Sequence, residues 1–275
     1  MPDKFEDPEE ENRKYWESVV ETHFASNFYE VDAWIKGGMK ARPWEADVIG
    51  RLDNKDAVHL QCHFGKDTLS LLSLGAASVT GIDYSESAIQ KARELAVITE
   101  LSDRSAFELC AVKDVPNFMT PKRFDFAYVS LGAICWIPAI STWAKAIDYL
   151  LKDTATLFVH EVHPLAQILN RGNGGWSLDG EYFESEVAMI DESDGSYTEN
   201  SENLRGYRTH IWNHSIGEVV TSLSNFGFSI SRLDEHSWTS FQQFPEMIKT
   251  GTERYVLPSD WLQLPLSFTI LASRG

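Results

Sequence analysis

Short apolar runs alternate with segments of helical periodicity along most of the chain. The apolar runs predict strands over residues 57–61, 78–82, 106–112, 124–129, 156–161, 227–230 and 266–272. Apolar positions three and four residues apart predict helices over 67–74, 86–101, 140–151 and 215–225. Such alternation favours a doubly wound α/β fold, in which a mostly parallel sheet binds ligands at the carboxyl ends of its strands.

Two stretches break this alternation. Residues 1–50 combine an acidic tip through residue 12, helical periodicity over 13–22 and an aromatic-rich segment over 27–34. We expect them to form an N-terminal helical cover segment in front of one domain that spans 51–275. Residues 171–210 are rich in Gly, Ser, Asn and acidic residues. Because this stretch is too long for a plain connector in a compact domain, we interpret it as a lid inserted after the fifth strand.

Composition and charge narrow the choice of partners. With 275 residues, 43% of them hydrophobic, the chain can bury one large core. A formal net charge of −17 without a visible run of Lys or Arg argues against nucleic acid as a partner. No signal-peptide pattern is visible and no apolar run approaches the roughly 18 residues of a membrane helix, so we expect a cytoplasmic protein with no membrane partner. The three cysteines lie in or beside predicted strands, which favours reduced thiols.

The candidate chemistry lies at the ends of the first two predicted strands. The first strand runs into the turn Gln61-Cys62-His63-Phe64-Gly65, and Asp83 follows the second strand eighteen residues after Gly65. Backbone amides of such a turn can approach a ligand, while a carboxylate at the second strand can accept hydrogen bonds from two ribose hydroxyls. A dinucleotide site would have G-x-G-x-x-G in the turn. Because only Gly65 is present, a nicotinamide-dependent oxidoreductase is disfavoured.

The same residues resemble a known family. Residues 59–70 read HLQCHFGKDTLS, and this segment is similar to the first motif, HLQCHFGxDTLS, of a poorly characterised branch of class I S-adenosylmethionine (SAM) dependent methyltransferases. The resemblance continues in GIDYSESAI at 81–89, FDFAYVS at 124–130, CWIP at 135–138, EVHP at 161–164 and WNHSIGE at 212–218. It implies a Rossmann-like seven-stranded sheet with helices on both faces, in the strand order three-two-one-four-five-seven-six, with an antiparallel last strand.

The resemblance also implies SAM as the cofactor and a set of residues that bind it. Asp83 would bind the ribose, Tyr84 would lie beside the adenosine and the backbone near Val112 would contact the adenine. The remaining cofactor-binding residues would come from the turn after the first strand and from the end of the fourth strand: Gln61, Cys62, His63, Gly65, Ser130, Leu131 and Gly132.

Three further residues are candidates for catalysis. His163 follows the fifth strand, where it would act either as a general base or as a structural residue before Pro164. Trp136 and Tyr29 could form walls of the transfer site, since aromatic faces attract a sulfonium, or could be core residues. No three-ligand histidine set can be assembled from the spacing, because His59 is predicted in a strand and His63 in a turn, so no metal is expected.

We expect methyl transfer to a small-molecule acceptor by in-line displacement, for which orientation can suffice without a base. Residues 172–204 contain nine Asp or Glu and no Lys or Arg. This segment is either a solvated acidic loop or a device that favours neutral or cationic acceptors. The alternative function is a SAM-binding regulatory or partner protein without turnover. The methylated atom type and the choice between monomer and homodimer stay open.

Overall fold

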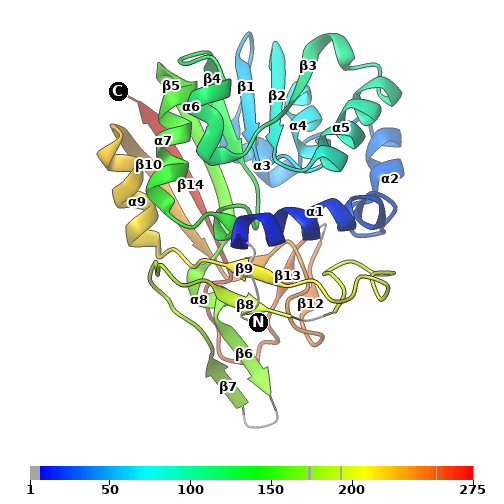
Figure 1. Ribbon diagram of the computed structural model, residues 1–275, viewed down its shortest axis with the longest axis vertical. Coiled ribbons are helices and arrows are strands. Elements are labelled where there is room, and N and C mark those ends of the chain that lie inside the picture. The colour runs from blue at the N-terminus through cyan, green and yellow to red at the C-terminus, as the bar shows by residue number, and fades with distance from the viewer. Residues whose placement is uncertain (1–6, 173–174, 193, 252, 275) are drawn as a thin grey trace, which may run out of the picture.

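A seven-stranded sheet organises the chain, and its strand order is the one that the resemblance implies. The computed structural model describes residues 7–172, 175–192, 194–251 and 253–274. In these residues, seven strands pair in the order β10-β14-β5-β4-β1-β2-β3 (Figure 1). β14 is antiparallel to β5 and β10, and the other pairs are parallel. The strands are β1 (Asp56–Leu60), β2 (Ser78–Asp83), β3 (Ser105–Leu109), β4 (Phe124–Val129), β5 (Leu151–Val162), β10 (Phe228–His236) and β14 (Ser267–Arg274). The predicted doubly wound fold is therefore confirmed.

Helices cover both faces of this sheet, and each face has its own apolar core. On one face, α7 (Ile140–Leu150) and α9 (Ile216–Asn225) bury Trp143 and Val219 against the sheet. On the other face, α4 (Lys66–Ser70), the 3-10 turn Leu71–Leu74 and α5 (Glu86–Ile98) bury Leu69 and Ile89. Strands buried on both faces explain why the sequence shows continuous apolar runs.

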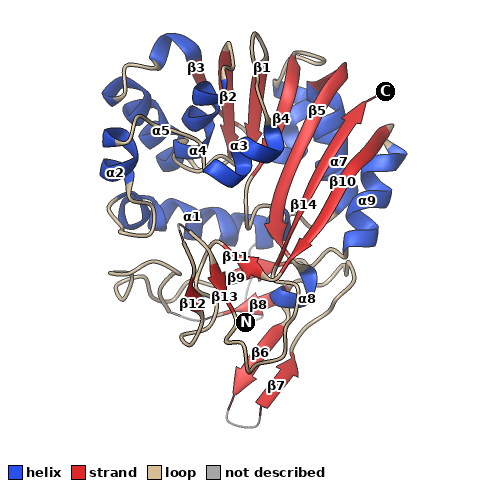
Figure 2. Cartoon of the chain, turned by 180° about the vertical axis from the view of Figure 1, so that it is seen from behind, coloured by secondary structure: helices blue, strands red, loops and turns tan. Residues whose placement is uncertain are grey.

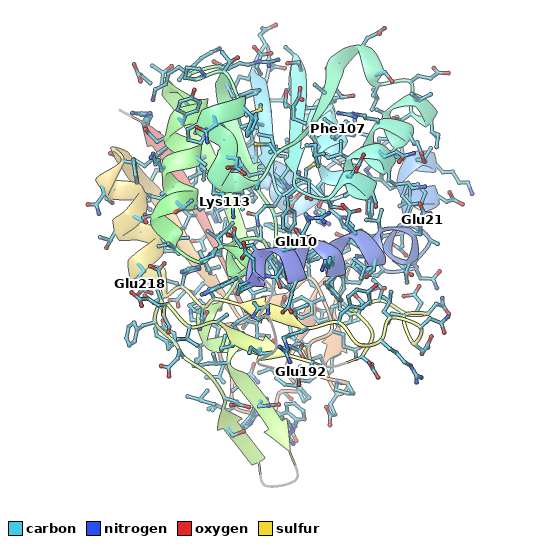
Figure 3. All side chains as sticks on the ribbon, viewed as in Figure 1. Glu10, Glu21, Phe107, Lys113, Glu192 and Glu218 are labelled. Carbon is cyan, nitrogen blue, oxygen red and sulfur yellow. The ribbon has the colours of Figure 1, made fainter. Side chains whose placement is uncertain are left out.

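Three helices lie within the N-terminal segment, and the first of them starts earlier than expected. It contains α1 (Pro8–Phe24), α2 (Val31–Lys36) and α3 (Pro43–Ile49). The expected start of the helix at residue 13 is wrong, because Asp7 caps α1 and three acidic residues in its first turn complement the helix N-terminus. α1 runs across the carboxyl edge of the sheet, close to the labelled Lys113 and with Glu21 near its end (Figure 3). Lys113 pairs with Glu9 at 2.6 Å, and Lys91 pairs with Glu21 at 2.8 Å.

The described residues between 169 and 211 extend beyond the sheet edge in two parts. β6 (Leu169–Gly172) and β7 (Gly175–Leu178) form a hairpin that projects from the molecule (Figure 2). β8 (Met189–Asp191) pairs with β9 (Thr209–Ile211), which lies against α1. There, Asn12 exchanges two hydrogen bonds of 2.8 and 2.7 Å with the backbone of His210. The lid role of this insertion stays a prediction.

A second small sheet was not predicted. It lies in the part of the chain between β10 and β14 and consists of β11 (Trp238–Thr239), β12 (Ile248–Lys249) and β13 (Tyr255–Val256). These strands pair in the order β11-β13-β12. Two-residue strands leave no periodic pattern to detect. The predicted third strand also ends earlier than expected, at Leu109 and not at Val112, because its neighbour β2 ends at the paired residue Asp83. Across the described residues, no helix is long and apolar enough to cross a membrane.

Candidate functional site

The turn after β1 adopts an unusual backbone conformation. Gln61, His63 and Gly65 have φ values of 57°, 50° and 77°, in the left-handed region that favours glycine. A non-glycine residue pays about 1–2 kcal/mol for this conformation, so the two side chains at 61 and 63 are held there by surrounding structure. Gly65 cannot be replaced without a shift of its surroundings, since a Cβ atom at this position would lie 2.5 Å from the Phe107 ring.

Asp83 connects this turn to the end of β2. Its two carboxylate oxygens accept hydrogen bonds from the backbone N–H groups of His63 (2.8 Å) and Ser85 (2.9 Å). Burial raises the pKa of Asp83 to about 6, and the backbone hydrogen bonds oppose that rise. The capping of α5 falls instead to Ser85, whose hydroxyl accepts from the Ala88 N–H. Asp83 is therefore placed at the sheet edge without being the helix cap.

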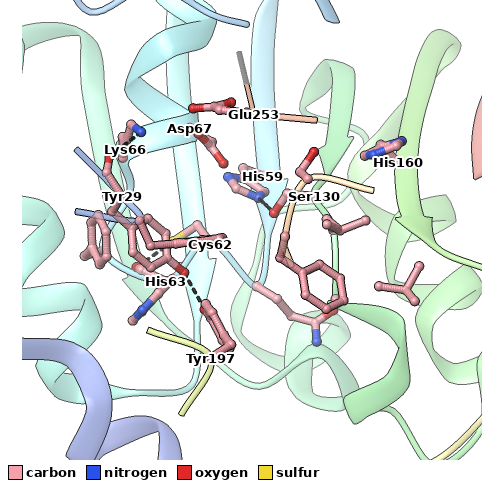
Figure 4. A pocket seen from close by; sticks show the side chains of 18 of the residues that line it. Tyr29, His59, Cys62, His63, Lys66, Asp67, Ser130, His160, Tyr197 and Glu253 are labelled. Atoms are coloured by element: carbon pink, nitrogen blue, oxygen red, sulfur yellow. Dashed lines mark hydrogen bonds between the residues drawn. The ribbon is translucent and has the colours of Figure 1, made fainter. Parts of the chain in front are cut away.

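Two neighbouring cavities open at this edge, and nearly all of the predicted site residues line them. The larger has a volume of about 280 Å³ and the smaller about 210 Å³. The predicted residues on the larger cavity are Tyr29, Gln61, Cys62, His63, Gly65, Ser130, Leu131, Gly132 and Trp136. Figure 4 labels four of them: Tyr29, Cys62, His63 and Ser130. Those on the smaller cavity are Gln61, Asp83, Tyr84, Val112 and Trp136.

Gln61 and Trp136 line both cavities and so stand between them. The Gln61 side-chain amide donates to the Ala133 carbonyl, and the Trp136 indole donates to the Gly132 carbonyl, each over 2.7 Å. The Gln61 side-chain oxygen is buried without a hydrogen-bond partner, as is the Tyr84 hydroxyl. Buried polar atoms normally have partners, so these two atoms are available to a ligand.

Glu161 holds the loop that carries Ser130 to Gly132. At the end of β5, its carboxylate accepts hydrogen bonds from the N–H groups of Ala133 (2.7 Å), Ile134 (2.9 Å) and Gly132. Burial raises the pKa of Glu161 to about 7 against the effect of these donors. No role was predicted for Glu161, although this residue begins the EVHP motif. It acts on the site by positioning the loop.

An ionic cluster from segments that are distant in the chain also lines the larger cavity. Arg42 contacts Glu45 and Asp67, each at 3.2 Å, and also Glu253. The Tyr128 hydroxyl donates to Glu45 over 2.8 Å. Burial raises the pKa of Glu45 to about 7, while Arg42 opposes the rise. Neither the cluster nor its position on the cavity was predicted, because no local pattern connects residues so far apart.

A hydrogen-bonded cluster of aromatic side chains connects another part of this cavity wall to α1. His23 and His63 approach to 3.0 Å through ring nitrogens, and the hydroxyls of Tyr29 and Tyr197 approach to 2.5 Å (Figure 4). Tyr197 also lies 3.4 Å from His23. Burial lowers the pKa of His23 to about 3, so its ring is uncharged at neutral pH. Trp16 of α1 lines the same cavity and contacts His63 and Trp136 edge-on.

His163 is the one predicted site residue that lines neither cavity. Its Nδ1 atom accepts from the Leu165 N–H (3.1 Å) at the start of α8 (Pro164–Gln167), and its Nε2 atom lies 2.8 Å from Glu235. Both ring nitrogens are therefore engaged in structural contacts. Of the two roles considered for His163, this geometry favours the structural one. Within the described residues, no group of three or more His, Cys, Asp or Glu side chains is arranged to hold a metal ion.

Comparison with known proteins gives a match over the central part of the chain. Residues 57–154 match a family described as a methyltransferase domain. The matched residues include the turn after β1, Asp83 and the loop after β4, and the match agrees with the resemblance seen in the sequence. A search of curated proteins found no match.

Solved structures share the fold of this chain. An S-adenosylmethionine dependent methyltransferase from Mesorhizobium loti is 19% identical, with a TM-score of 0.61 over 84% of this chain and 96% of that one. A SAM-dependent methyltransferase from Methanosarcina mazei is 18% identical, with a TM-score of 0.57 over 86% and 98%. A structure titled as a DhpI–SAH complex is 14% identical, with a TM-score of 0.56 over 98% and 97%. At these identities the likeness establishes the fold.

Proposed function

We propose that the protein transfers a methyl group from SAM to a small-molecule acceptor. The observation that carries this proposal is the position of Asp83, at the end of β2 beside a cavity that adjoins the left-handed turn after β1. The match to a methyltransferase domain supports it and indicates SAM as the cofactor. The similar structures support it too, because two of them are described as SAM-dependent methyltransferases.

The residues of the smaller cavity suit an adenosine. The Asp83 carboxylate can accept hydrogen bonds from ribose hydroxyls, and the Tyr84 hydroxyl is buried without a partner. Val112 follows the end of β3 and can present its backbone to an adenine. Gln61 adjoins both cavities, and its unpartnered oxygen can accept a hydrogen bond from an ammonium group. These residues would hold the two ends of one elongated cofactor.

When bound, SAM supplies an electrophilic methyl group on a sulfonium. The chain then has to hold a nucleophile behind that methyl group and exclude water, and orientation alone corresponds to effective molarities of about 10⁵ to 10⁸ M. Trp136 and Tyr29 are placed on the wall of the larger cavity, where they can orient an acceptor. We further propose that residues 1–50 and 171–210 cover the site, since Trp16, Tyr29 and Tyr197 reach the cavity from these segments.

Calorimetric titration with SAM and S-adenosylhomocysteine tests the cofactor assignment. We expect both to bind, and the absence of binding by the folded protein would reject the proposal. A screen of metabolites with isotopically labelled SAM then identifies an acceptor without assuming its class. Tight SAM binding without turnover over a broad panel would support the alternative of a SAM-binding regulatory protein. Preference for NAD(H) over SAM would instead support an oxidoreductase.

A further inference from the structure

Aromatic rings dominate the wall of the larger cavity. They come from the N-terminal cover, the turn after β1, the loop after β4 and both segments beyond β5. Flat apolar faces favour a ligand with a flat apolar body, because such a body buries the most area against them. The rings are those of Trp16, Phe28, Tyr29, Phe64, Trp136, Tyr197 and Phe241.

The acidic and basic side chains of the same wall compensate one another. Arg42 is the centre of a cluster that contains Glu45, Asp67 and Glu253. Its positive charge is therefore already shared among carboxylates. An anionic ligand that entered this part of the cavity would meet three acidic side chains around an occupied guanidinium, and it would lose its hydration without gaining a free partner.

The other basic groups of the wall are also engaged or uncharged. The Lys66 ammonium donates to the Tyr29 carbonyl over 2.5 Å. Burial lowers the pKa of His59 to about 4 and also lowers the pKa of His63 and His160 well below the usual value. A cationic ligand would be repelled by the sulfonium of the proposed cofactor. The balance of charges therefore favours an uncharged ligand.

Tyr29 and Tyr197 provide a polar contact within this aromatic wall. Their hydroxyls are 2.5 Å apart, and either can donate to the other. Tyr197 is 47% exposed, so its side chain reaches from the cavity wall to solvent. A hydroxyl group of a ligand placed against Tyr29 would thus join a path of two phenols that leads out of the cavity.

We propose that the methyl acceptor is an uncharged aromatic alcohol whose hydroxyl contacts the Tyr29–Tyr197 pair; this inference rests on the proposed function. In the transfer, the acceptor oxygen forms a bond to the methyl carbon, the carbon–sulfur bond breaks, and its electron pair goes to sulfur. The hydroxyl proton passes to Tyr29 while Tyr29 gives its proton to Tyr197, which releases one to water. The two tyrosines end unchanged, so charge and atoms balance.

Three probes with one ring system isolate the effect of the head group. The full-length protein would be incubated with labelled SAM and 2-naphthol, 2-naphthoate or 2-(aminomethyl)naphthalene at pH 7.5. We expect kcat/KM for 2-naphthol to exceed that for the other two by at least about tenfold. Equal or faster methylation of the anion or the cation would overturn the proposal. Tight binding of S-adenosylhomocysteine without methylation of 2-naphthol would overturn it too, whereas failure to bind the nucleoside would reject the proposed function itself.

Variants of the two tyrosines test their role in moving the proton. Tyr29→Phe and Tyr197→Phe should each lower kcat for 2-naphthol by at least about tenfold, within the usual contribution of a proton-transfer group, with KM and SAM affinity within about twofold. Tyr149→Phe is the matched control, because the Tyr149 hydroxyl bonds the Met119 carbonyl away from both cavities. An unchanged kcat in both site variants, or a loss confined to KM, would contradict the proton path.

Discussion

The backbone N–H of His63 donates a 2.8 Å hydrogen bond to Asp83 Oδ2, so one side chain connects the turn after β1 to the end of β2. The carboxylate therefore has two tasks in the proposed enzyme. It stabilises a left-handed turn, and it presents acceptor oxygens at the smaller cavity. Substitution of Asp83 affects both, and the two effects can be measured separately.

Asp83→Asn should weaken SAM binding. The variant keeps the side-chain volume but loses the charge, and a hydrogen bond to a charged group contributes about 1.5–3 kcal/mol. This loss corresponds to a roughly ten- to hundredfold rise in the dissociation constant, measured by calorimetry. Thermal unfolding of the same sample reports the separate effect on the turn. An unchanged dissociation constant would remove Asp83 from the cofactor site.

The pKa of Asp83 gives this prediction a pH dependence. Because burial raises that pKa to about 6, the carboxylate is charged at pH 7.5 and becomes protonated as the pH falls through 6. SAM affinity of the unaltered protein should therefore decrease between pH 7 and pH 5. Asp83→Asn should lack this step, which makes it the control for other groups that titrate in the same range.

Glu161→Gln should destabilise the loop after β4. The amide group of Gln would face N–H donors that now bond a carboxylate, and each buried donor left without an acceptor costs about 1–3 kcal/mol. The pKa of Glu161 is raised to about 7, so its contribution to stability is complete below the ordinary value of 4.5 and is lost as the pH rises through 7.

The difference in unfolding free energy between the two proteins should therefore become smaller from pH 5 to pH 8. Urea denaturation at both pH values measures it. Glu108→Gln is the control, because Glu108 is exposed on β3. A difference that grows with pH would contradict the assigned titration.

Gly65→Ala should reduce stability far more than Gly227→Ala. Both glycines have left-handed backbones, with φ of 77° and 82°, so both variants incur the strain of about 1–2 kcal/mol. Only at Gly65 would the new Cβ atom lie 2.5 Å from the Phe107 ring, whereas nothing lies within 4 Å of it at Gly227. Overpacking adds about 1–3 kcal/mol. Equal melting temperatures for the two variants would show that the Phe107 ring can move aside.

His163→Ala should leave kcat unchanged at saturating acceptor. The ring of His163 caps α8 and contacts Glu235 outside both cavities, so its loss should appear as reduced stability of about 0.5–2 kcal/mol, the usual value of a helix cap. His163→Asn, which restores a capping acceptor, should recover part of that stability. A large fall in kcat in a folded variant would instead support a general base.

The strands and the edge of the sheet that carries the site could be predicted from local patterns in the sequence, whereas the strand order was implied by the resemblance to methyltransferases. Buried parallel strands give continuous apolar runs, and Asp83 ends one of them. The start of α1 could also have been predicted, since Asp7, Pro8 and three acidic residues are typical of a helix N-terminus, but helical periodicity was expected only over 13–22.

The rest of the site depends on contacts between distant segments. Arg42, Asp67 and Glu253 meet only because α3, α4 and the small sheet converge on one cavity. Tyr29 follows α1 in the chain and Tyr197 follows β8, and their hydroxyls meet only in the folded structure. No spacing in the chain encodes such encounters. For His163, the EVHP motif predicted a position at the sheet edge. The sequence does not show in which direction the ring points.

Cys62 and Cys135 both line the larger cavity, and burial raises the pKa of both thiols well above the usual value. Because the thiolate is the form that reacts with electrophiles, the two sulfurs should stay inert as long as the surrounding segments are in place. The rate at which the two cysteines are alkylated should therefore report how often residues 1–50 and 171–210 move away from the cavity.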